Sequence, residues 1–204
     1  SEPIDERDMM IRLAMLRHGH PHWNRAGQIQ GRTDIPLDDE AREGLAEFKL
    51  PAGWDAAELV ASPLLRAQET GEIVTGRRPA VVDALIEMDW GDWEGKKGVD
   101  LKADPNSGFR DIEQWGWDYQ PPGGESPQMV WDRLAPWLFG LKRDCIAVCH
   151  IGIMRMILAK AHGWDFDGPA PFAVKRNRLF VVEIEGDTVK VADPDIVRLE
   201  RRSA

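Results

Sequence analysis

Short apolar segments that alternate with helical patterns constrain the fold of this 204-residue chain most strongly. Four of them have the length of buried parallel strands, and most contain β-branched residues: Met10–Leu16, Glu58–Ala61, Ala80–Val82 and Cys145–Cys149. Apolar residues recur at helical spacing between them. We therefore expect an α/β fold, a three-layer αβα sandwich around a mostly parallel central sheet.

Local signals predict where several helices begin and where a hairpin lies. Asp38 is a candidate N-cap for a helix whose apolar residues run from Leu37 to Phe48. Ser62-Pro63 and Ser126-Pro127 each place an N-cap serine before a proline suited to the first helical position. Near the C-terminus, Glu185-Gly186-Asp187 separates two apolar runs and predicts an antiparallel hairpin at one side of the sheet.

The chain shows no linker, repeat or low-complexity tract, so we expect one domain over residues 1–204. Residues 92–125 differ from the rest because they are rich in Gly, Pro, Asp and Trp. This composition predicts an insertion that folds over the active site.

Charge and composition exclude several classes of partner. The formal net charge is -9, from 26 basic and 35 acidic residues, which argues against nucleic acid and against an anionic membrane surface. No stretch reaches the roughly 18 apolar residues of a membrane span. Cys145 and Cys149 share one predicted buried strand, so we expect them to be reduced and the protein to be cytoplasmic.

Polar residues of matching chemistry follow the predicted strands. Arg17-His18 follows the first strand, Arg66 lies in the first turn of the helix after the second, Glu87 follows the third, and His150 follows the last. Ligands bind beyond the carboxyl ends of strands in open α/β sheets, so we expect these side chains to converge. An arginine can grip two phosphoryl oxygens, and it keeps a neighbouring histidine unprotonated and nucleophilic. The set suits phosphoryl transfer.

From Leu16 to about Gly163 the chain resembles the histidine phosphatase superfamily, also called the phosphoglycerate-mutase-like family. The resemblance depends on the order and spacing of several motifs. They are Arg17-His18-Gly19, Asn24, the helix start from Ser62-Pro63 through Arg66-Ala67 to Thr70, Glu87 ahead of Gly91-Asp92-Trp93-Glu94-Gly95, and His150-Ile151-Gly152.

The resemblance implies a role for each matching residue. His18 would be the nucleophile that forms a phosphohistidine, and Glu87 would protonate the leaving oxygen and then deprotonate water. Gly19 would allow a close approach of the backbone. Arg32 would lie near the substrate, although a surface ion pair explains it equally well. No metal and no cofactor are implied. The residues implied to bind the phosphoryl oxygens are Arg17, Asn24, Arg66 and His150.

Two features depart from the family pattern, and one property stays open. His20-Pro21 replaces the usual Glu-Thr or Glu-Ser after Arg-His-Gly, and Ile151 replaces the first glycine of the late motif. Both changes affect the pocket wall and leave the charged residues in place.

The direction of the pKa shift of Glu87 is the property that the sequence leaves open. Burial and substrate charge would raise the pKa of Glu87 above its usual range, while the arginines would lower it.

We expect a phosphomonoester hydrolase that acts on a small phosphorylated metabolite, as a monomer or homodimer. A phosphoglycerate-mutase-type transferase is the alternative, but mutases tend to have a longer insertion than the 63 residues (150 minus 87) between Glu87 and His150. A non-catalytic binding protein on the same fold is a third reading. A metal site at the alternating His18, His20 and His22 is a fourth, and no nearby Cys or carboxylate cluster supports it.

Overall fold

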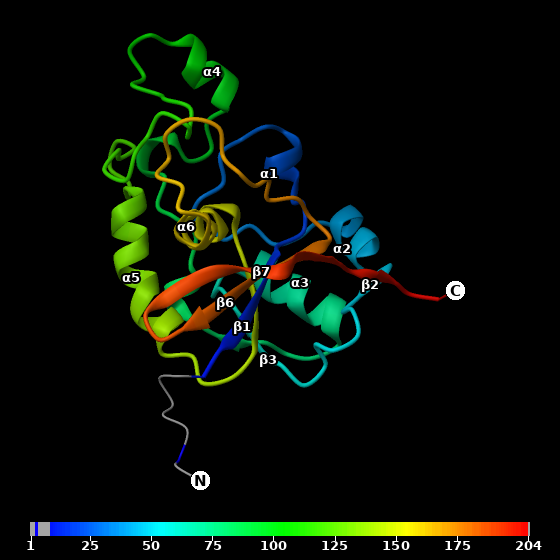
Figure 1. Ribbon diagram of the computed structural model, residues 1–204. Coiled ribbons are helices and arrows are strands. Elements are labelled where there is room, and N and C mark those ends of the chain that lie inside the picture. The colour runs from blue at the N-terminus through cyan, green and yellow to red at the C-terminus, as the bar shows by residue number, and fades with distance from the viewer. Residues whose placement is uncertain (1–2, 4–8, 204) are drawn as a thin grey trace.

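The computed structural model describes residue 3 and residues 9–203, and its central sheet confirms the α/β prediction (Figure 1). The sheet has the strand order β4-β3-β5-β1-β6-β7. Its first four strands are mutually parallel, and β6 and β7 are antiparallel to their neighbours. The strands are β1 (Ile11–Arg17), β3 (Glu58–Ala61), β4 (Ala80–Val81), β5 (Cys145–Cys149), β6 (Arg178–Glu185) and β7 (Thr188–Arg198).

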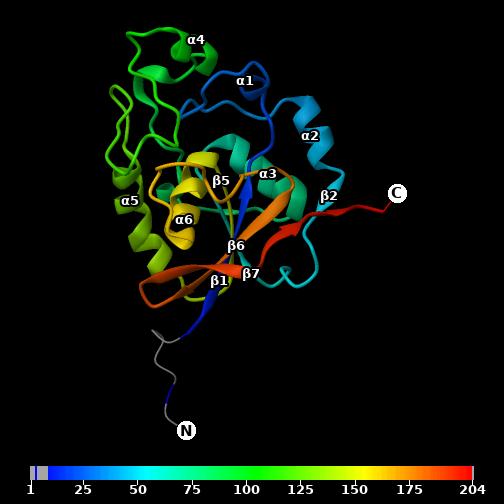
Figure 2. The ribbon, with the colours of Figure 1, turned by 45° about the horizontal axis from the view of Figure 1, so that its top comes forward.

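Helices cover both faces of this sheet, as the three-layer prediction requires. In Figure 1, α5 (Pro127–Phe139) and α6 (Ile151–His162) lie on one side, and α2 (Asp39–Leu45) and α3 (Leu65–Thr75) on the other. Figure 2 shows α1 (His22–Arg25) and α4 (Gly98–Ala103) beyond the end to which β1 points. The short 3-10 turns are η2 (Asp83–Leu85) and η3 (Gly91–Trp93), and β2 (Phe48–Lys49) pairs with β8 (Glu200–Arg201) in a separate small sheet.

Alternation along β1 explains how one strand serves two cores. Leu13 and Met15 pack into the cluster that contains α5 and α6, while Ala14 and Leu16 pack into the cluster that contains α2 and α3. Residues Cys145–Cys149 are all fully buried, which fits a parallel strand covered by helices on both faces. Both cysteines are free, as predicted, and burial raises the pKa of each thiol.

Two of the three predicted N-caps are confirmed. The Asp38 carboxylate accepts a hydrogen bond from the Ala41 amide at 2.9 Å, and the Ser126 hydroxyl accepts one from the Met129 amide at 3.2 Å. The prediction for Ser62-Pro63 is wrong. Helix α3 begins at Leu65, two residues later than the proline, and Leu64 occupies the N-cap position without a side-chain bond.

The hydroxyl of Ser62 has other partners, which explains the late helix start. It accepts a hydrogen bond from the Leu64 amide at 3.2 Å and lies 2.7 Å from a ring nitrogen of His150. This is a local serine turn rather than a helix cap. Other differences are boundary shifts: Met10 and Val82 lie outside their strands, and Phe48 belongs to β2 rather than to α2.

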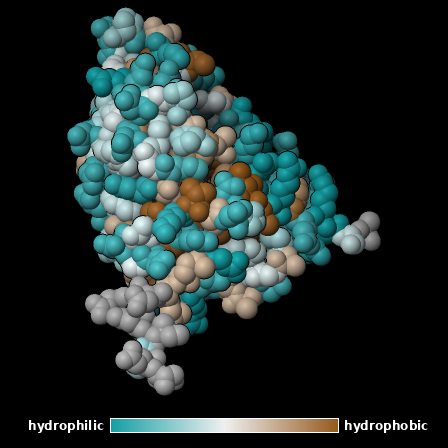
Figure 3. Space-filling view, viewed as in Figure 1, coloured by the Kyte–Doolittle hydropathy of each residue, from teal (hydrophilic) through white to brown (hydrophobic). Residues whose placement is uncertain are grey.

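The predicted hairpin is confirmed as β6 and β7, and β7 forms one edge of the sheet. Figure 3 shows the side of the molecule that faces the viewer in Figure 1. Hydrophobic residues gather in the middle of this side, near the place of β6 and β7 in Figure 1, and the surface around them is largely hydrophilic. Ile196 of β7 is 42% exposed. Asp193, Pro194 and Asp195 also lie on β7, where charge and a missing amide donor oppose pairing with another strand.

Among the described residues, none of the helices has both the length and the apolar character that crossing a membrane requires.

Candidate active site

The pairing of β1 with β5 brings two histidines together. Arg17 lies opposite Cys149 in the register, so His18 and His150 leave the sheet at the same level. The His18 amide donates to the Cys149 carbonyl at 3.0 Å. The two imidazole rings have centroids 5.1 Å apart, and both residues are buried. The convergence predicted for these two residues is therefore present.

The ring of His18 is neutral and holds one free nitrogen. Its Nδ1 lies 2.6 Å from the Gly19 carbonyl oxygen, which only accepts, so Nδ1 carries the proton and donates. Burial holds the pKa of His18 well below its usual range, and Arg66, Arg176 and Arg17 lower that pKa further. Nε2 is consequently left with an unprotonated lone pair.

His150 has the opposite arrangement. Its Nε2 lies 2.7 Å from the Ser62 hydroxyl, and its buried Nδ1 has no hydrogen-bond partner among the described residues. Burial holds the pKa of His150 well below its usual range. The Ser62 hydroxyl has one proton to donate, and its oxygen already accepts from Leu64. When the hydroxyl donates this proton in a hydrogen bond to Nε2, the neutral His150 ring carries its own proton on Nδ1.

Arg66 contributes a fully buried cation from the first turn of α3. Its two terminal nitrogens donate to the carbonyls of Thr33 and Gly31, at 2.9 and 2.6 Å, while its Nε is buried without a partner among the described residues. Thr70, one turn later, accepts from the Gly19 amide at 2.8 Å and fixes the loop that carries His18. Although α3 begins later than predicted, Arg66 does lie in its first turn and is a buried arginine near the histidines.

Glu87 is the buried carboxyl group of the cluster, at 1% exposure. Burial raises its pKa, although hydrogen bonds from the amides of Met88 (2.7 Å) and Gly152 (3.3 Å) and the charges of Arg66 and Arg155 oppose that rise. The direction that the sequence left open is thus upward. Such a shift raises the fraction of Glu87 that is protonated at a given pH.

The structure places the remaining predicted residues around this cluster. Arg17 donates to the Val174 carbonyl at 2.9 Å, and its buried Nε is unpartnered among the described residues. Asn24 accepts a hydrogen bond from Arg176 at 3.4 Å. Arg32 donates to the Glu87 carbonyl at 3.2 Å and forms an ion pair with Glu125 at 3.0 Å. Arg32 therefore supports the backbone of Glu87 and also forms an ion pair, which is the alternative given for it in the sequence analysis.

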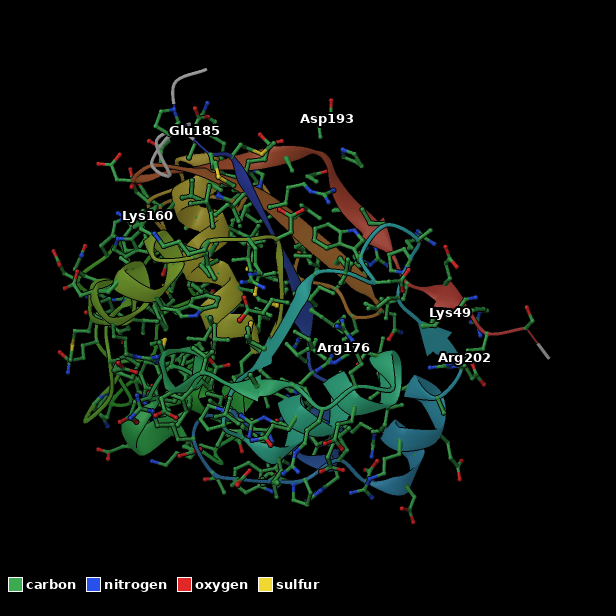
Figure 4. All side chains as sticks on the ribbon, turned by 90° about the horizontal axis from the view of Figure 1, so that it is seen from below. Lys49, Lys160, Arg176, Glu185, Asp193 and Arg202 are labelled. Carbon is green, nitrogen blue, oxygen red and sulfur yellow. The ribbon has the colours of Figure 1, made fainter. Side chains whose placement is uncertain are left out.

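Sequence reasoning missed two arginines of the site, Arg155 and Arg176. Arg176 lies just before β6, which runs antiparallel to β1, so the start of β6 and the end of β1 share one edge of the sheet. Figure 4 shows Arg176 toward the centre of the molecule, whereas Lys49, Glu185 and Asp193 lie near its outer edge. Arg155 stands among apolar residues on α6, which is a signal that the sequence offered.

A cavity of about 280 Å³ adjoins this cluster. Asn24, Trp90 and Ile151 line it together with Gln30 and Arg155. Residues of the predicted insertion form much of the wall: Gly98, Phe109, Arg110, Asp111, Ile112 and Trp115. Within the described ranges, no group of three or more His, Cys, Asp and Glu side chains is arranged to hold a metal ion.

Comparison with known proteins establishes the family. A family model described as the histidine phosphatase superfamily (branch 1) matches residues 13–195. The chain belongs to this superfamily.

Its relatives carry both phosphatase and mutase names. The glucosyl-3-phosphoglycerate phosphatase of Mycolicibacterium vanbaalenii is 29% identical over 202 residues, which cover 90% of this chain and 88% of the relative. A 2,3-bisphosphoglycerate-dependent phosphoglycerate mutase of Azorhizobium caulinodans is 32% identical over 139 residues, 61% of this chain and 65% of the relative. A solved phosphoglycerate mutase of Thermus thermophilus has a TM-score of 0.65 at 28% identity, and the match covers 94% of this chain and 100% of that one.

Two glycines of the superfamily motifs have clear steric reasons in this chain. A Cβ at Gly152 would overlap the Glu87 carboxylate, so the second residue after His150 is the one that must be glycine. Ile151 lines the cavity instead, which is why the first position tolerates a large side chain. A Cβ at Gly19 would lie 2.8 Å from Leu45, so the close approach here is to α2.

The lowered pKa values of the two histidines predict how stability depends on pH. Between the folded-state pKa and the unfolded-state value of about 6.5, the unfolded chain binds more protons than the native chain, so stability falls as the pH falls. Each histidine contributes at most about 1.4 kcal/mol per pH unit. The raised pKa of Glu87 acts in the opposite direction above about pH 4.5. The free energy of unfolding, measured by urea denaturation at several pH values between 7 and 5, should fall less steeply with falling pH for His150→Gln than for the parent protein. An equal dependence on pH in the two proteins would contradict the lowered pKa of His150.

Proposed function

We propose that the protein is a phosphomonoester hydrolase that works through a covalent phosphohistidine at His18. The observation that carries the proposal is a neutral imidazole surrounded by buried donors without partners. These donors are the Nε atoms of Arg17, Arg66 and Arg176, together with Nδ1 of His150. A phosphoryl group has oxygens for all of them, and desolvated donors without a partner are costly. The cluster is therefore complementary to a phosphoryl group rather than to water alone.

The first step forms the phosphoenzyme. Nε2 of His18 attacks phosphorus, and the bond from phosphorus to the ester oxygen breaks. The arginines and His150 neutralise the charge that builds on the phosphoryl oxygens. The leaving alkoxide takes the proton of Glu87, whose raised pKa suits it to act as an acid.

The second step releases phosphate. A water molecule gives its proton to Glu87, now a carboxylate, and attacks phosphorus as the bond to Nε2 breaks. Inorganic phosphate leaves, and His18 and Glu87 return to their starting states. Over the two steps, every bond that forms is matched by one that breaks, and Glu87 regains the proton that it gave. Neither step requires a metal or a redox group.

A mutase is the second candidate, because several relatives carry that name. We favour hydrolysis because the segment between Glu87 and His150 is short. The relatives matched over most of both chains include a phosphatase as well as mutases by name, so they do not decide between the two. With 3-phosphoglycerate and a bisphosphate primer, isomer formed faster than inorganic phosphate would reverse this choice.

We propose a small phosphate ester as the partner. The compound in the name of the phosphatase relative, glucosyl-3-phosphoglycerate, is one model for it. The two free buried cysteines fit a reducing cytoplasm.

Replacing His18 tests the proposal directly. His18→Ala should lower phosphate release from p-nitrophenyl phosphate at least about 10³-fold, because the nucleophile is lost. Excess chelator should leave the parent activity unchanged. His162→Ala is a matched control, since this residue ends α6 roughly 18 Å along the helix axis from His150. Activity retained in His18→Ala would sink the proposal.

Glu87→Gln tests the acid separately from the nucleophile. A nitrophenolate leaves without a proton, whereas an alkoxide needs one, so kcat/KM should fall about 10²-fold or more for an alkyl phosphate and at least tenfold less for p-nitrophenyl phosphate. For the alkyl ester, kcat/KM of the parent protein should also decline as the pH rises past the raised pKa of Glu87. Equal losses on both esters would remove Glu87 from this role.

A further inference from the structure

Among the described residues, the hydrogen bonds to the carboxyl group of Glu87 both come from backbone amides. One oxygen accepts from the Met88 amide at 2.7 Å, and the other accepts from the Gly152 amide at 3.3 Å. A Cβ on Gly152 would overlap the carboxyl group, which therefore fits tightly against the start of α6. The place of this acid consequently depends on how the backbone at residue 87 is held.

Arg133 of α5 holds the backbone that carries this acid. Its two terminal nitrogens donate to the carbonyls of Ala84 at 2.7 Å, Ile86 at 2.9 Å and Glu87 at 3.3 Å. Residues 86–90 belong to no helix or strand. Such a segment lacks the repeating hydrogen bonds of a helix or sheet, so its carbonyls need other donors to fix them. One guanidinium supplies donors to three of these carbonyls.

Glu125 keeps Arg133 in this position. Its carboxylate accepts from Nε of Arg133 at 3.0 Å and from a terminal nitrogen at 3.2 Å, which makes a two-bond pair. The same carboxylate accepts from the Asp89 amide at 2.8 Å and from Arg32 at 3.0 Å. Arg32 also donates to the Glu87 carbonyl. Since the side chains of Glu125 and Arg133 are 12% and 23% exposed, water and salt screen the pair little.

The backbone of the acid segment also packs directly against the end of the predicted insertion. The Glu125 amide donates to the Asp89 carbonyl at 2.8 Å. A Cβ on Gly91 would overlap the Pro122 carbonyl, and a Cβ on Gly124 would overlap the Asp89 carbonyl. Two segments packed this closely leave no room for one to shift against the other. The segment that carries the acid is therefore fixed to the start of α5.

We propose that Arg133 is a positioning residue that holds Glu87 where it can protonate the leaving oxygen. The inference rests on the proposed function and adds a residue that acts through the acid. The nitrogens of Arg133 donate to the backbone of the acid segment and to Glu125, so Arg133 itself contacts no reacting atom. Proton transfer needs heavy atoms within about 2.6–3.2 Å of each other. A misplacement of about 1 Å can lower a rate about 10²-fold.

Two other effects of Arg133 would leave a different kinetic trace. Its charge is one of the smaller causes of the lowered pKa of His150, and burial is the largest. An effect through His150, which we propose to bind the phosphoryl group, would slow the hydrolysis of every phosphate ester equally. A general loss of packing would do the same. An effect through Glu87 falls mainly on esters whose leaving group needs a proton.

Kinetics on two kinds of ester test this inference. For Arg133→Met, kcat/KM should fall at least about tenfold more for an alkyl phosphate that the parent protein hydrolyses, such as glycerol 3-phosphate, than for p-nitrophenyl phosphate. Arg133→Lys keeps the charge and loses the planar fork, so it should show a smaller difference. Arg12→Met is the matched control, because Arg12 forms a two-bond pair with Asp144 at the opposite end of β1. It should leave the ratio of the two kcat/KM values unchanged.

A double substitution distinguishes positioning of the acid from a structural role. Glu87→Gln already lacks the acid, so adding Arg133→Met should change the ratio of the two kcat/KM values by less than about twofold. A further tenfold change in that background, or equal losses on both esters for Arg133→Met alone, would overturn the inference. If thermal denaturation shows that Arg133→Met does not fold, Glu125→Gln replaces it, with the same direction of change expected and the same result excluded.

Failure of the underlying function has its own signature. Phosphate release that persists in His18→Ala, or equal losses on both esters in Glu87→Gln itself, would reject the nucleophile or the acid before Arg133 is considered.

Discussion

The parallel pairing of β1 with β5 is the constraint on which the site depends. Arg17 lies opposite Cys149, so the chain leaves both strands at one level and delivers His18 and His150 side by side. A slip of one residue in either strand would turn its histidine toward the opposite face of the sheet. The complete burial of β5 opposes such a slip. A slip would move the side chains that now pack in one core into the other core, on both faces of the sheet. The cores on the two faces therefore hold the register that brings His18 and His150 together.

The site gathers buried polar groups that a phosphoryl group would satisfy. Two neutral imidazoles, a carboxyl group with a raised pKa and several arginines occupy one buried cluster, and four of its donor nitrogens have no partner among the described residues. This arrangement opposes folding, because desolvated donors without partners are costly. In the proposed reaction it would favour the transition state of phosphoryl transfer, because the donors would require no reorganisation when charge develops on the phosphoryl oxygens. The apolar packing around β1 and β5 offsets this cost.

The sequence predicted the parts of the fold and of the site that depend on strand ends. Parallel strands share a carboxyl edge, and family motifs follow them, so His18, Arg66, Glu87 and His150 were found together. Arg176 was not, because its position depends on the antiparallel direction of β6. The sequence pattern predicts a helix cap at Ser62, because the partner that the structure shows, His150, is 88 residues away in the sequence. The pKa of Glu87 depends on a balance of burial against amide bonds and charges, which requires coordinates.

Trapping the covalent intermediate tests the central claim most directly. The parent protein is mixed with a phosphate ester labelled on phosphorus, quenched in base within milliseconds and digested for mass spectrometry. The account predicts a phosphorylated peptide that survives base, decomposes in acid and carries the label on His18. A label on another residue, or steady release of phosphate with no phosphoenzyme at any quench time and any ester, would contradict it.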